Sequence, residues 1–244
     1  MNAPRTARDR ARAEVMAELV SAARARLDTE GAAALSLRAV ARDLGMASSA
    51  VYRYVDSRDA LLTLLVIEGY DAVGAVCEDT AARARAHGAD AAQTWLEVAR
   101  GVRAWAIANP RIFELVYGTP VPGYEAPQET VDSATRIWQV LLTTVRGAIA
   151  DGSLQSPGPD FDTTGLLADD TLAFLGTTAG TDPEDRRALE VATLRSFTLF
   201  SSLVGAISTE LFGHLHKVVT DYARTFDVTI ATAAAGVGLF IDLD

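Results

Sequence analysis

The sequence predicts an all-α protein, and three observations support that prediction. Apolar residues recur at spacings of three and four along most of the 244 residues, which is the period of an amphipathic helix. Hydrophobic residues make up 49% of the chain and alanine is prominent among them, a composition that favours helix. Glycine and proline fall mainly between the periodic stretches, where helices end or begin. A chain of this length can bury an ample core, so we expect one or two domains.

The N-terminal residues divide into a basic arm and a first helix. Residues 1–11 are rich in arginine and have no apolar core, so we expect a disordered arm. Arg5, Arg8 and Arg10 either lie along the phosphates or the minor groove of a nucleic acid, or make no contact; both alternatives stay open. From Arg12 to about Glu30 the period of a helix is clear, with one apolar face made by Val15, Leu19, Ala22, Ala23 and Leu27.

A second helix and a sharp turn are predicted next. Ser36 stands before an apolar-periodic run, so its hydroxyl is placed to cap the free amides of the following turn. The run continues through Leu37 and Val40 to Leu44 and stops at Gly45. A residue just past a helix end often needs a positive φ, which glycine adopts at no steric cost.

The third predicted helix, from about Ala47 to Tyr54, has two unlike faces. Its inward residues are Ala50, Val51 and Val55. Its outward residues are small, hydroxylated or cationic, namely Ser48, Ser49, Tyr52 and Arg53. Such a face suits a helix that enters the major groove of DNA, because base edges and phosphates there need donors and little bulk. Two short helices joined by a tight turn are the order of a helix-turn-helix.

At this point the chain resembles a known family. The string LGMASSAVYRYVDSRDALL is similar to the DNA-binding domain of the TetR family of bacterial one-component repressors. The likeness lies in the Leu44–Gly45 corner, the Tyr52-Arg53-Tyr54 run and the basic Arg58 that opens the next helix, and it covers roughly residues 12–65. Two positions depart from the family pattern: Ala47 offers no capping oxygen, and Val55 replaces an aromatic residue.

The resemblance implies a DNA-binding domain over residues 12–60 and a set of contacts within it. We expect Ser48, Ser49 and Arg53 to reach base edges, with Arg53 best suited to guanine. The residues expected to hold phosphates are Ser36, Arg38, Tyr52, Tyr54 and Arg58. Asp56 or Ser57 is placed to cap the next helix.

Residues 61–244 are interpreted as a ligand-sensing and dimerisation domain. A long helix from Arg58 to about Arg85 links it to the DNA-binding domain, and helices over 91–109, 110–117 and 127–150 follow. Residues 95–127 and 194–215 resemble the sensor domain of one TetR subfamily. The implied pocket is apolar, against the alternative of plain core packing. Its candidate residues are Trp95, Val102, Trp105, Phe113, Tyr117, Trp138, Leu141 and Phe174.

The last helices are expected to pair two copies of the chain. A loop over residues 151–162 and a helix ending near Phe174 precede them. Thr181 to Glu184 reads as a helix start, with a capping side chain and then proline in the first turn. The helix to Leu211 is apolar on more than one face and must be covered on more than one face. With a helix over 218–239 it would form an isologous interface, whose candidate residues are Phe197, Phe200, Val204, Tyr222 and Phe226.

Charge and composition narrow the function classes. Residues 1–60 hold 10 arginines and 8 acids, whereas residues 61–244 hold 12 basic and 24 acidic residues. A basic segment on an acidic chain is expected of a nucleic-acid reader joined to a sensor. A single cysteine, Cys77, excludes an internal disulfide and reads as apolar filler. No run of about 18 apolar residues stands out, so we expect a cytoplasmic protein that does not span a membrane.

These observations predict a homodimeric TetR-type transcriptional regulator. We expect a repressor that binds an approximately palindromic operator in double-stranded DNA and is released by a small apolar or aromatic effector ligand. The alternative is a DNA-binding dimer without an effector. An enzyme on the same fold is disfavoured because the chain has none of the common nucleophile, phosphate-loop or metalloprotease signatures. No cofactor and no metal site are expected, since His214 and His216 would point to different faces of a helix.

Overall fold

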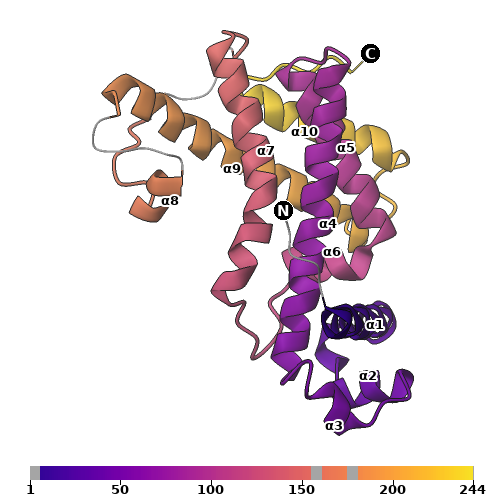
Figure 1. Ribbon diagram of the computed structural model, residues 1–244. Helices are drawn as coiled ribbons and strands as arrows, with labels where there is room; N and C mark the ends of the chain where they lie inside the picture. Colours follow the sequence, from indigo (N-terminus) through magenta and orange to yellow (C-terminus); the bar gives the residue numbers. More distant parts are fainter. Residues whose placement is uncertain (1–5, 155–160, 175–180, 244) are drawn as a thin grey trace. The chain divides into compact units, whose positions relative to one another are not determined.

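The computed structural model describes residues 6–154, 161–174 and 181–243 (Figure 1), and within them the chain is helical and has no strand. The all-α prediction is therefore confirmed. The α-helices are α1 (Ala7–Glu30), α2 (Leu37–Asp43), α3 (Ser48–Val51), α4 (Arg58–Ala86), α5 (Ala91–Ala108), α6 (Pro110–Tyr117), α7 (Val131–Ala150), α8 (Asp169–Phe174), α9 (Pro183–Leu211) and α10 (Tyr222–Val237), with short 3-10 turns η1 (Ala32–Ala34) and η2 (Gln128–Thr130).

The chain packs as two compact units. The N-terminal unit holds the residues up to Ala72 together with Ala108–Ala134, and the C-terminal unit holds Val73–Ile107 with Thr135 onward. The sequence suggested a division at residue 60, whereas the packing also gathers the first half of α4, all of α6 and the loop after it into the N-terminal unit. Local periodicity cannot reveal this grouping, because it depends on contacts between distant segments.

The first helix begins earlier than the sequence suggested. Thr6 and Asp9 form a capping box, in which each side chain accepts a hydrogen bond from the backbone amide of the other. The Thr6 hydroxyl also donates to the Asp9 carboxylate at 2.7 Å, and this bond, followed by the one from the Thr6 amide, lowers the pKa of Asp9. Two of the otherwise unpaired amides at the helix start are satisfied in this way. The expectation of a disordered arm over residues 1–11 is therefore wrong for Ala7 onward, while Arg5 lies outside the described residues.

The N-terminal unit has the predicted helix-turn-helix built on a shared core. Leu19 and Leu27 of α1 and Val40 of α2 are fully buried, as are Val51 of α3 and Leu65 of α4. Gly45 turns the corner after α2 with a φ of 64°, as its position predicted. Figure 1 shows α1, α2 and α3 gathered beside the first turns of α4. The helix α3 is shorter than expected, because Arg53 and Tyr54 close a tighter turn onto the carbonyls three residues before them.

Two contacts explain why α6 joins the N-terminal unit. A Cβ on Gly69 would lie 2.7 Å from Cγ2 of Ile112, so only glycine lets α4 and α6 approach this closely. The guanidinium of Arg24 on α1 donates to both Glu68 on α4 and the side chain of Asn109, which begins α6. This pair of bonds from one guanidinium, which we call the Arg24 fork, therefore joins three helices that are far apart in sequence.

The C-terminal unit is built around α5, α7 and the α9–α10 pair. The predicted stripe on α5 is buried, including Trp95 and Val102. Asp182 caps α9 and Pro183 occupies its first turn, as expected. Helices α9 and α10 lie side by side, and α10 begins at Tyr222 rather than at residue 218 because Asp221 accepts from the amide of Arg224.

Two helices, α4 and α9, are long and apolar enough to cross a membrane by length and composition alone. The core helix of a soluble protein passes the same test, and half of the relevant window in α4 is buried inside the molecule. This feature is therefore weak support for a membrane span.

Candidate nucleic-acid interface

The helix α3 is anchored by one face and open on the other. Val51 is fully buried and Val55, just past the helix, is nearly so. On the opposite face Ser49 and Arg53 are exposed, and the aromatic ring of Tyr52 is 46% exposed. The exposed ring and hydroxyl of Tyr52 are therefore available to a partner. The predicted outward face is thus confirmed as a surface, with Ser48 half-buried at its start.

The start of α2 differs from the prediction. No backbone amide donates to the Ser36 side chain, so the expected cap is missing, and only the main-chain carbonyl of Ser36 accepts from the amides of Ala39 and Val40. The extended backbone of Ser36 is that of a capping residue, but its hydroxyl is not used as one. The absence of a cap at α3 was foreseen, because Ala47 has no side-chain oxygen.

Arg58 is partly engaged by partners within the protein. Its guanidinium donates to the main-chain carbonyls of Ala32 (2.9 Å) and Leu35 (3.2 Å), and it lies 3.6 Å from Asp59. These bonds hold the η1 turn against the start of α4. The donors expected to bind phosphate are thus largely engaged within the protein, which points to a positioning role. Ser57 caps α4 through a 3.0 Å bond from the amide of Ala60, as expected.

The arginines of the N-terminal unit fall into two groups. Arg24 and Arg26 on α1 are paired, Arg24 with Glu68 and Arg26 with both Glu30 and Asp43. The hydrogen bond from Arg26 lowers the pKa of Asp43. Arg38 and Arg53, on α2 and just after α3, are exposed, and neither meets a carboxylate within 4 Å among the described residues. Exposed, unpaired guanidinium groups are the donors that a DNA backbone or a guanine edge needs.

The residues predicted to line a ligand pocket are divided between the two units. Trp95, Val102 and Leu141 are buried in the C-terminal unit, where Trp105 and Trp138 are half-buried. Trp138 packs against the rings of Phe197 and Phe200, with centroids 5.2 and 4.3 Å away. The other candidates do not join this group.

Phe113 and Tyr117 belong to the N-terminal unit, where their rings contact each other and Tyr117 meets Tyr70 edge-on. The hydroxyl of Tyr70 donates to the carbonyl of Val116, and burial raises the pKa of this tyrosine. Phe174 closes α8, but its side chain lies outside what the structure describes.

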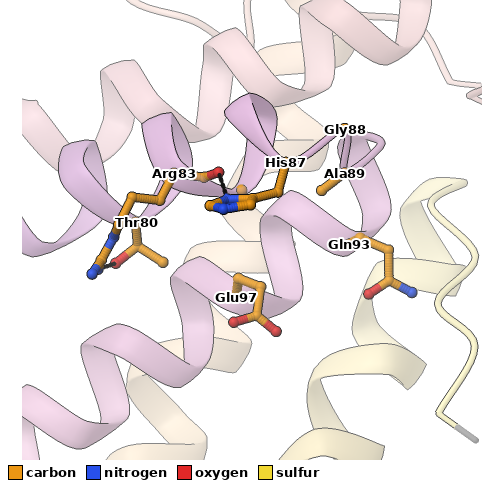
Figure 2. Close-up of a pocket in the computed structure, with 8 residues that line it drawn as sticks. Thr80, Arg83, His87, Gly88, Ala89, Gln93 and Glu97 are labelled. Carbon is orange, nitrogen blue, oxygen red and sulfur yellow. Dashed lines mark hydrogen bonds between the residues drawn. The ribbon is translucent and has the colours of Figure 1, made fainter.

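A polar recess lies where α4 turns into α5 (Figure 2). Its volume is about 560 Å³, and Thr80, Arg83 and His87 face Gln93 and Glu97 across it. The His87 ring bonds the carbonyl of Arg83 through Nδ1 at 2.7 Å. None of the eight predicted ligand residues lines this recess, and its charged lining differs from the apolar pocket that the sequence suggested.

The predicted dimer residues differ in exposure. Phe197 is 39% exposed on α9, and Phe200, Val204 and Tyr222 are half-buried. Phe226 is 4% exposed and lies under the guanidinium of Arg103, so it is a core residue and was misplaced by the sequence reading. Two residues later on α10, Val228 is 47% exposed. The two positions lie on different faces of one helix, which composition alone cannot distinguish.

Comparison with known proteins agrees with this architecture. Residues 19–65 match the model of bacterial regulatory proteins of the tetR family, and residues 95–233 match the tetracyclin repressor-like C-terminal domain. HTH-type transcriptional regulators of Mycobacterium tuberculosis and Mycobacterium bovis are 39% identical over 231 residues, covering 89% of each chain.

Solved structures share the fold. The proposed regulatory protein SCO4313 has a TM-score of 0.69 at 31% identity, over 96% of this chain and 100% of that one. A protein of unknown function from Rhodococcus sp. RHA1 has a TM-score of 0.67 at 20% identity, over 91% and 94% of the two chains, and it supports the fold alone.

Proposed function

This chain belongs to the TetR family of helix-turn-helix transcriptional regulators. We propose that it is a cytoplasmic repressor, and that two copies of the chain bind together to one palindromic operator. The observation that carries the proposal is the pairing of a buried anchor, Val51, with an open face at Tyr52 and Arg53. A helix fixed by one face and cationic on the other fits the major groove of double-stranded DNA.

The roles of individual residues follow from their surroundings. Arg53 is assigned to a guanine edge, and Ser48 and Ser49 to neighbouring bases. Arg38, Tyr52, Tyr54 and Ser36 are assigned to phosphates, where the unused hydroxyl of Ser36 is a suitable donor. Arg58 is reassigned to holding the turn before α2, because carbonyls at 2.9 and 3.2 Å occupy its guanidinium.

Dimerisation is expected through α9 and α10. Members of this family dimerise, and α9 and α10 leave Phe197 and Val228 open at 39% and 47% exposure. A second copy related by a two-fold axis would cover the same residues on both chains. Two DNA-binding domains held in this way read half-sites about one helical turn apart or slightly more.

The test uses an operator selected from random DNA by the wild-type protein. Arg53→Gln should weaken binding by about 10- to 100-fold for each half-site contact, because one bidentate contact discriminates by about 1–3 kcal/mol. Arg146→Gln is the matched control, since Arg146 is an exposed arginine of α7 in the other unit. Equal affinities for the wild type and the Arg53 variant, with the fold intact, would refute the assignment.

The effector that we propose is a small, largely apolar molecule carrying one hydrogen-bond acceptor. Support comes from α5, where Nε1 of Trp95 and Oγ1 of Thr94 are buried and have no hydrogen-bond partner in the described part of the chain. Other helical threonines, among them Thr144 and Thr193, donate to the carbonyl four residues earlier. An unpaired buried polar group costs about 1–3 kcal/mol, so a ligand that supplies an acceptor gains by satisfying it.

The runner-up function is a DNA-binding dimer without an effector, in which buried water would satisfy Trp95 and Thr94. Thermal shifts of the whole protein across a library of apolar compounds, with and without a carbonyl or carboxylate, separate the two. The effector proposal expects a stabilising hit that also releases the selected operator. Trp95→Phe should weaken that hit while leaving operator binding unchanged. A broad library without any hit favours the runner-up.

A further inference from the structure

In the first two turns of α1, arginines occupy the helix face that is apolar in the rest of the helix. Leu19 and Ala23, which are buried, and Val15 lie on one face of α1, and positions Arg12 and Arg8 continue the same row toward the N-terminus at spacings of three and four. Both arginines are exposed and neither has a carboxylate within 4 Å among the described residues. Glu14 falls on the other side of the helix from Arg12, whereas Glu18, three residues after Val15, lies beside the apolar part of the row and further from Arg12.

One of these arginines is held in place by the DNA-reading segment. The Cζ atom of Arg12 lies 5.4 Å from the centroid of the Tyr54 ring, a cation–π distance. Tyr54 lies three residues after the end of α3 and is half-buried, so its ring is partly held by its neighbours. The capping box of Thr6 and Asp9 keeps the turn that carries Arg8 helical. The arginine row is therefore ordered, and it begins at the end of the recognition segment.

We propose that Arg8 and Arg12 form a second set of contacts with the operator, in which they bind backbone phosphates that flank the bases read by α3. The proposal rests on the DNA-binding function given above and adds contacts outside the helix-turn-helix itself. Guanidinium groups are suited to phosphate, and the positive end of the α1 dipole adds to the attraction. Tyr54 acts as a positioning residue for Arg12, in addition to any phosphate contact of its own hydroxyl.

The proposal has a quantitative signature. Each phosphate neutralised on double-stranded DNA contributes about 0.9 to the slope of log affinity against log salt concentration. A dimer that loses one arginine contact from each chain should therefore show a slope smaller by roughly 2. The contact should also need duplex beyond the bases read by α3, because Arg12 lies over Tyr54, which is past the end of that helix.

The experiment measures binding of the full-length protein to its selected operator between about 50 and 200 mM salt. Arg12→Gln and Arg8→Gln should each reduce the slope by roughly 2 and weaken binding at low salt. Arg146→Gln should leave the slope unchanged. On a duplex trimmed to the bases that α3 reads, the wild type and the Arg12 variant should bind equally. Thermal unfolding confirms that each variant is folded.

A second comparison tests whether the Tyr54 ring positions Arg12. Tyr54→Phe keeps the ring under Arg12, whereas Tyr54→Leu removes it. If Tyr54 positions Arg12, the additional loss of affinity in Tyr54→Leu relative to Tyr54→Phe should be smaller in the Arg12→Gln background than in the wild type. Additive effects would overturn the positioning role.

The outcomes separate this proposal from the function on which it rests. The flanking phosphate contacts are overturned if Arg12→Gln has the same salt slope as the wild type, or if its loss of affinity persists on the trimmed duplex. In either case Arg53→Gln should still abolish tight binding, because the proposed function does not depend on those contacts. If Arg53→Gln has no effect either, the proposed function itself has failed.

Discussion

Arginine serves two different purposes in this molecule, and the balance between them differs between the two units. In the C-terminal unit Arg100, Arg103 and Arg136 each form a two-point pair with a carboxylate, on Asp227, Glu210 and Glu78 respectively. In the N-terminal unit Arg8, Arg12, Arg38 and Arg53 have no carboxylate within 4 Å among the residues that the structure describes. A guanidinium with a carboxylate beside it stabilises the fold, and one without remains available to a polyanion.

The difference explains how an acidic protein can bind DNA. The net charge of −10 comes from carboxylates concentrated after residue 60, and several of them are the partners of arginines in that region. Net charge alone would argue against nucleic acid. The local supply of unpaired cations on α1 and α2 and beside α3 is the quantity that matters for DNA binding.

The largest expected effect tests whether the paired arginines are structural. Arg103 and Glu210 join α5 to α9 at 2.7 Å, and their side chains are only 18% and 15% exposed. Arg103→Met leaves a mostly buried carboxylate unpaired and should lower the free energy of unfolding by about 2 kcal/mol, a value discounted for the remaining exposure. Urea unfolding at fixed protein concentration measures it, and the salt slope of DNA binding should not change.

Two controls sharpen this prediction. Arg103→Met combined with Glu210→Leu should recover most of the loss, because no charge is then left unpaired. Arg100→Met, at a pair whose arginine is 45% exposed, should cost less than about 1 kcal/mol. Equal losses at Arg100 and Arg103 would contradict the dependence on burial.

A smaller effect concerns Arg26, a paired arginine in the unit where most are unpaired. Its hydrogen bond lowers the pKa of Asp43 below the ordinary 3.8. A carboxylate whose pKa is depressed in the folded state stabilises the fold above its unfolded pKa, and this contribution is lost as the pH falls through the folded value. Arg26→Gln should therefore lower the melting temperature at pH 7, and the gap from the wild type should narrow below pH 3.8. A gap that does not vary with pH would contradict the role of this pair.

The smallest expected effect is an absence of reaction. Cys77 is buried in the C-terminal unit, and burial raises the pKa of its thiol to about 12. Because the thiolate is the reactive form, the folded protein at neutral pH should not react with a thiol reagent, whereas the unfolded chain should react fully. Mass spectrometry of the native and urea-treated protein measures this, and rapid labelling of the native protein would show that the unit opens readily.

Local features of the fold were predictable from the sequence. The Gly45 corner, the Asp182–Pro183 start of α9 and the end of α6 at Gly118 depend on residues within one or two turns of each other. The open face of α3 was also predictable, because its polar residues recur with the period of a helix. These features require no knowledge of distant partners.

Other features depend on contacts between distant segments, and the sequence did not reveal them. Arg58 bonds carbonyls more than 20 residues earlier, so its basic character alone suggested a phosphate contact. Phe226 lies under Arg103, which precedes it by more than 100 residues. The association of Arg12 with Tyr54 is of the same kind. The one available signal was the row in which arginines replace the apolar residues of α1.

The Arg24 fork has a consequence for how this chain can diverge. One guanidinium serves Glu68 and Asn109 on two other helices, so replacing Arg24 leaves both acceptors without it, and replacing either acceptor leaves Arg24 short of one partner. Among descendants of this gene we expect these three codons to change in concert, and lineages that keep Arg24 should keep an acceptor at both other positions.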